Sequence, residues 1–69
     1  MAIKQDPTEA TREMKDALKE HRLEQYRAQI FSLEMDLAAY TALGEEAKAE
    51  KTREAIDSGK KAYAAVEVM

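Results

Sequence analysis

The chain has 69 residues, 36% of them charged, and a formal net charge of −3. A chain this short forms one domain at most and buries only ~60% of its unfolded surface, so partners often add to its stability. It has no cysteine and a single histidine, which excludes disulfides, thiolate metal sites and multi-histidine clusters within one chain.

The first predicted helix follows an N-terminal segment, residues 1–6. Asp6 suits the N-cap, Pro7 suits the first helical position, and Glu9 is placed to complete a capping box. No glycine or proline interrupts the chain from there to Gly44, so a long helix is expected over 7–43. Gly44 is the residue expected for a left-handed cap at its end.

The second predicted helix, 46–68, follows a turn at 44–45. Acidic residues at 45 and 46 favour the positive end of the helix dipole. One uninterrupted helix would instead place Lys51 and Glu54 on its apolar face, so the turn is favoured. A break at Ser58-Gly59 is the remaining alternative, because a glycine inside a helix costs ~1 kcal/mol relative to alanine.

Apolar and small residues are arranged symmetrically about Gly44. Six positions in each half recur at spacings of 3, 4, 3, 4 and 3, which is the pattern of one helix face. Paired from the outside inward, their residue numbers always sum to 89. The pairs are Leu23 with Val66, Tyr26 with Tyr63, Ile30 with Gly59, Leu33 with Ile56, Leu37 with Thr52, and Tyr40 with Ala49. We predict an all-α fold, an antiparallel two-helix hairpin joined by this coiled-coil seam, with Glu34 and Arg53 paired at its flank.

Two apolar features lie outside the predicted seam. Residues 7–22 overhang the second helix by about 24 Å and carry an apolar line. That line consists of Ala10, Met14, Ala17, Leu18 and His21. A second stripe, about 150° around the long helix from the seam, consists of Ala28, Phe31, Met35, Ala38 and Ala42.

A helix that is apolar on two sides is normally buried on two sides, and the short helix covers only one. We therefore predict a homo-oligomer, with a two-fold dimer forming a four-helix bundle as the favoured assembly; larger rings or a complex with another protein would also cover the apolar stripe. The predicted interface residues are Met14, Leu18, His21, Ala28, Phe31, Met35, Ala38 and Ala42.

A basic line runs along the overhang. Its members, spaced 3, 4 and 3, are Arg12, Lys15, Lys19 and Arg22. Local ion pairs, such as Arg12 with Asp16, favour a solvated face. The alternative is an anion site for nucleic acid, a nucleotide or an acidic partner. The net negative charge and the lack of interleaved aromatic residues disfavour nucleic acid.

The sequence contains no recognisable catalytic, cofactor or metal motif. No serine or cysteine shares a face with His21, and a Glu-x-x-His metal motif would need glutamate where Leu18 stands. We therefore predict no enzyme, no cofactor and no metal site. The expected function is that of a small self-associating adaptor, inhibitor or assembly component, as in some phage or mobile-element accessory proteins; the alternative is a nucleic-acid- or nucleotide-binding regulator.

The expected location is the cytoplasm, or a larger intracellular or viral assembly, without membrane contact. The longest run free of charged and strongly polar residues, Leu37 to Leu43, is far shorter than the ~20 residues that a membrane span needs. The first residues also lack the hydrophobic core of a signal peptide.

Overall fold

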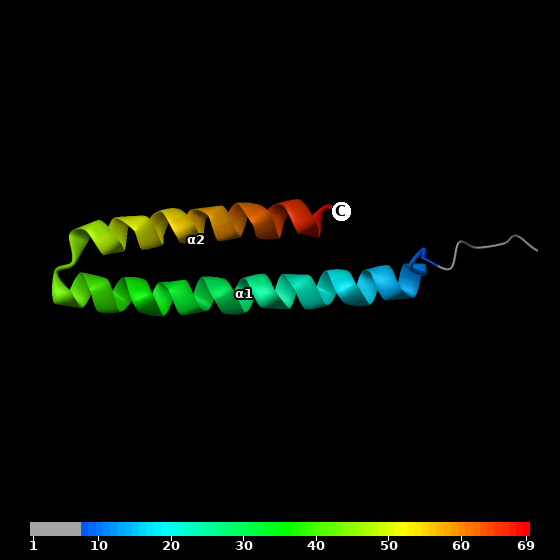
Figure 1. Ribbon diagram of the computed structural model, residues 1–69, viewed down its shortest axis with the longest axis horizontal. Helices are drawn as coiled ribbons and strands as arrows, with labels where there is room; N and C mark the ends of the chain where they lie inside the picture. The colour runs from blue at the N-terminus through cyan, green and yellow to red at the C-terminus, as the bar shows by residue number, and fades with distance from the viewer. Residues whose placement is uncertain (1–7) are drawn as a thin grey trace, which may run out of the picture.

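The protein is an all-α hairpin of two antiparallel helices (Figure 1). The computed structural model describes residues 8–69, and the helices are α1, Arg12–Leu43, and α2, Glu46–Glu67. They pack side by side along the whole length of α2, and α1 continues beyond the end of α2 (Figure 1). The predicted fold class is therefore confirmed. Neither helix has an apolar stretch long enough to cross a membrane.

The start of α1 differs from the predicted helix over 7–43. Thr11 is the N-cap: its backbone is extended, and its side-chain oxygen accepts a hydrogen bond of 3.2 Å from the Met14 amide. Thr8 and Glu9 lie in a turn and a bend before this cap, so Glu9 does not occupy the third helical position expected for it. Asp6 and Pro7 lie outside the described residues. A threonine oxygen satisfies an otherwise unpaired amide of the first turn, which favours a helix beginning here.

Gly44 ends α1 in the left-handed conformation, with φ of 73°. Its amide donates to the carbonyl of Thr41 at 3.2 Å, and the Glu45 amide donates to the carbonyl of Tyr40 at 2.9 Å. These two bonds satisfy carbonyls that the last turn would otherwise leave unpaired. The chain reverses within two residues, and this short turn sets the register of the hairpin.

The seam between the helices follows the predicted mirror pairs. Every paired position is buried or half-buried, and the least exposed are Leu23, Ala49, Thr52 and Ile56. The helices approach closely at Gly59, where an added Cβ would lie 3.2 Å from Cγ1 of Ile30. Glycine thus admits the isoleucine side chain, and α2 continues through Gly59 without the alternative break.

A buried threonine and a rearranged ion pair complete the seam. Thr52 is only 7% exposed, and its hydroxyl donates to the Lys48 carbonyl at 2.8 Å. The predicted flank pair between Glu34 and Arg53 is wrong: Arg53 instead binds Glu50, three residues earlier on α2, at 3.2 Å. A partner on the same helix needs less ordering of the two long side chains than one across the seam.

Candidate functional site

The side of α1 that faces away from α2 carries exposed large apolar side chains. Met14 is 53% exposed, Leu18 and Phe31 are each 61% exposed, and Met35 is 54% exposed. Every residue of the predicted interface set is exposed in the hairpin. Isolated exposed apolar residues are common in proteins, but an aligned row is the pattern of an interaction surface. The role of these residues as an interface stays a prediction.

The two apolar features of the sequence analysis are one surface in the structure. Because α1 is continuous from Arg12 to Leu43, the arm line, apart from Ala10 before the helix, shares one helix face with the second stripe. The steps along this face alternate between three and four residues, with Leu18 next to Ala17. We call this surface the outer stripe, and it consists of Met14, Ala17, Leu18, His21, Glu24, Ala28, Phe31, Met35, Ala38 and Ala42. Glu24 is its one acidic residue.

The outer surface of α2 differs in character. Its exposed side chains include charged residues joined along the helix, with Lys61 and Asp57 3.1 Å apart and Arg53 and Glu50 3.2 Å apart. Such exposed pairs contribute little to stability and keep a surface hydrated. Of the two helices, only α1 therefore carries a long second apolar face.

A groove opens where α2 ends and α1 continues. It encloses about 830 Å³, and the whole basic line of the sequence analysis borders it: Arg12, Lys15, Lys19 and Arg22. Apolar lining comes from Leu18, which also belongs to the outer stripe, from Tyr26 of α1, from Val66 of α2 and from Met69 beyond its end. The structure thus brings the four cations together with an apolar floor, which spacing within α1 alone does not reveal. We call this feature the end groove.

The seam of α1 becomes charged within the end groove. Counting backward from Leu23 in steps of four, three and four leads to Lys19, Asp16 and Arg12. Lys19 is half-buried, and its Nζ donates to the main-chain oxygen of Met69 at 2.9 Å. The expected ion pair between Arg12 and Asp16 does not form. The seam phase extended past Leu23 therefore indicates from the sequence that this part of α1 has a charged face, whereas the groove and its apolar lining depend on where α2 ends.

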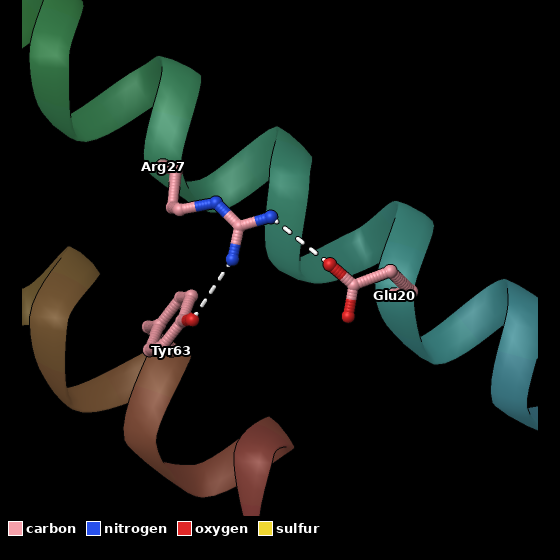
Figure 2. Close-up of polar contacts among 3 residues, drawn as sticks. All are labelled: Glu20, Arg27 and Tyr63. Carbon is pink, nitrogen blue, oxygen red and sulfur yellow. Dashed lines mark hydrogen bonds and ion pairs between the residues drawn. The ribbon is translucent and has the colours of Figure 1, made fainter.

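Arg27 joins the two helices at the edge of the seam (Figure 2). Its guanidinium donates to the Tyr63 hydroxyl and to a Glu20 carboxylate oxygen, both at 3.0 Å, and lies 5.8 Å from the centre of the Tyr63 ring. The bonds to Glu20 and then to Tyr63 raise the pKa of Arg27. The arginine is therefore a fixed positive charge that joins α1 to α2 through Tyr63.

No family model, curated protein or solved structure matches this chain. Within residues 8–69, no group of three or more histidine, aspartate and glutamate side chains is arranged to hold a metal ion. The two distinctive surfaces of the hairpin are the outer stripe and the end groove.

Proposed function

We propose that this protein is a non-enzymatic helical module that self-associates through the outer stripe of α1. The observation that carries the proposal is the exposure of Phe31 and Met35, at 61% and 54%, on the side of α1 opposite the seam. Full burial of a side chain of this size is worth about 1.5–3 kcal/mol. A small hairpin with few buried residues gains substantially from covering such a surface.

A second copy fits this stripe in one antiparallel register. If α1 packs on α1 of the partner so that opposed residue numbers sum to 59, Phe31 meets the small Ala28 of the other copy. In the same register, His21 meets Ala38 and Ala17 meets Ala42. Phe31 and His21 thus face alanine, as Ile30 faces Gly59 within the hairpin, whereas Met35 faces Glu24.

Charge supports this register over its neighbours. By the geometry of an antiparallel coiled coil, Arg27 then flanks Glu34 of the partner on both sides of the two-fold axis. Glu34 makes no hydrogen bond or ion pair in the described chain, so it is available for such a contact. A shift of seven residues toward the N-terminus opposes Arg27 to itself, and the reverse shift opposes Glu34 to itself. Both alternatives place like charges together.

The resulting dimer is flatter than the four-helix bundle expected from the sequence. The seam and the outer stripe lie about 150° apart on α1, whereas a square bundle needs the two contact faces of a helix about 90° apart. Four helices therefore form a nearly straight row, with the two α1 helices inside and the two α2 helices outside. Such a layer presents the charged faces of α2 to solvent and acts as an adaptor, inhibitor or assembly component through protein contacts.

Sedimentation equilibrium at micromolar concentration tests this proposal. The wild-type chain is expected to form a dimer, and Phe31→Glu is expected to be monomeric while keeping its helical circular dichroism. Leu43→Glu is the matched control, because Leu43 is 72% exposed but lies off the outer stripe. A monomeric wild-type chain, or a Phe31→Glu variant that unfolds, contradicts the proposal.

Charge exchange tests the register itself. Arg27→Glu and Glu34→Arg are each expected to weaken the dimer, and the double variant is expected to recover part of the lost affinity. Recovery requires that the two side chains meet between copies, because Arg27 contacts Glu20 and Tyr63 within one copy. A double variant that dimerises no better than either single variant shows that another register forms.

A further inference from the structure

The end groove is a seam without its second helix. Residues 12–21 of α1 continue past the last turn of α2 for about 15 Å at 1.5 Å per residue. Farther along α1, the same face is covered by α2 and carries Leu23, Ile30 and Leu37. Beyond α2 it is open, with a volume of about 830 Å³. A helix placed end to end with α2 would occupy the same position relative to α1.

The chemistry of the groove specifies the charge of such a helix. Arg12, Lys15, Lys19 and Arg22 border the groove, and Asp16 is its one acidic residue. Lys19 already holds a main-chain oxygen of the α2 terminus at 2.9 Å. Carboxylates presented at the edges of an incoming helix would find cations along the groove. Its apolar side chains would pack on the aliphatic stems of Lys19 and Arg12, which face it directly, on Leu18, and next to the end of α2 on Tyr26 and Val66.

A phosphate chain fits the same groove less well. Asp16 lies among the cations that border the groove, so a phosphate chain laid along it would meet this carboxylate as well as four bases. Tyr26 is half-buried in the seam and offers little ring surface for stacking with bases. A helix, by contrast, accommodates Asp16 with a single basic residue of its own. A second copy of the arm is disfavoured because it would bring two basic lines together.

We infer that the end groove binds an acidic amphipathic helix of a partner protein, which continues the line of α2 along α1. Leu18 of the outer stripe also borders the groove, but Phe31 and Met35 do not, so the groove contact does not require that a second copy cover Phe31. The bound helix is about three turns long, has apolar residues facing the seam, and has glutamate or aspartate along both edges. The hairpin then has one surface for its own copy and another for a different chain.

The test uses a synthetic 14-residue helix with leucine at the a and d positions, glutamate at e and g, and one central lysine. It is titrated against the labelled full chain, and amide shifts are followed by NMR. We expect saturable shifts confined to the groove residues and about a tenfold loss of affinity in the Arg12→Glu, Lys15→Glu variant. The matched control, Lys51→Glu with Lys60→Glu, reverses two exposed lysines outside the groove and is expected to bind normally.

Two further probes distinguish an amphipathic helix from other ligands of the end groove. A peptide of the same composition without an apolar stripe is expected to bind at least about tenfold more weakly, because only a helix with both features fills the groove. Absence of binding by the amphipathic peptide, or equal binding by both peptides, overturns the inference. A single-stranded oligonucleotide that binds more tightly than the peptide, with the same loss in Arg12→Glu, Lys15→Glu, overturns it in favour of a nucleic-acid site. Phe31→Glu should leave peptide binding unchanged, so failure here and failure of the dimer are separable.

Discussion

The two long sides of α1 share one spacing but differ in composition and in cover. The seam carries branched aliphatic residues at most levels and is closed by α2, which leaves Leu23 only 5% exposed. The outer stripe has alanine at four of its ten positions, and its large apolar side chains, Met14, Leu18, Phe31 and Met35, are all more than half exposed. Periodicity identifies both faces, and packing distinguishes them. A row of buried aliphatic and aromatic residues holds a hairpin together, whereas alanines with exposed large side chains between them suit a contact made after folding.

The largest difference in stability between the two faces is expected when one side chain on each is truncated. Ile56→Ala removes a seam residue that is 8% exposed, and we expect it to lower the free energy of unfolding by about 2–3 kcal/mol. Met35→Ala removes a side chain that is 54% exposed and should change the stability of the dilute monomer by less than ~0.5 kcal/mol. Urea titrations followed by circular dichroism measure both. Equal losses would mean that the two faces are not energetically distinct.

Replacing Gly44 in the turn that places α2 on the seam should lower the free energy of unfolding by a smaller amount. Gly44 has φ of 73°, and an added Cβ would meet no atom within 4 Å, so Gly44→Ala changes only the backbone energy. We expect a loss of about 1 kcal/mol because alanine disfavours the left-handed region. Gly44→Asn is the control and should lose less, since asparagine tolerates this conformation. Thermal melts of the three chains give the order, and an alanine variant as stable as wild type would contradict it.

A double-mutant cycle measures the energetic coupling between Gly59 and Ile30 across the seam. Gly59→Ala gains up to ~1 kcal/mol of helix propensity but brings Cβ to 3.2 Å from Cγ1 of Ile30. We expect these effects to offset each other in the wild-type background. With Ile30→Ala also present, the same glycine replacement should stabilise the hairpin, with a coupling of about 0.5–1 kcal/mol. Additive behaviour of the two changes would show that glycine is not needed for contact there.

The smallest expected effect lies at the exposed edge of the seam. Tyr63→Phe removes the hydroxyl that accepts a hydrogen bond from Arg27 but keeps the ring packed. We expect the thermal midpoint to fall by about 2 °C or less, because exposed polar contacts contribute little. Tyr26→Phe is the control, since the Tyr26 hydroxyl makes no hydrogen bond within residues 8–69. A large fall of the thermal midpoint in Tyr63→Phe would show that this exposed contact contributes as much to stability as the buried seam residues.

The pairs of the seam were predictable because the same short-range rules act in both halves of the chain. Steps of three and four residues place Leu33 and Ile56 on facing sides, and Gly44 provides the one conformation that reverses the chain between them. The partners of long charged side chains were less predictable. Arg53 has Glu34 within reach across the seam by register, yet it binds Glu50 of its own helix. Such choices depend on rotamers and solvent exposure, which periodicity does not encode.

The hairpin, its register and the second apolar face of the long helix follow from the sequence alone, because residue spacing and one glycine specify all three. Only the tertiary structure decided where α1 begins, because Thr11 caps it with a hydrogen bond to the Met14 amide. It also decided that the four bases of the arm border one groove with Tyr26 and Val66. That groove depends on where α2 ends beside α1, a relation between residues far apart in the chain.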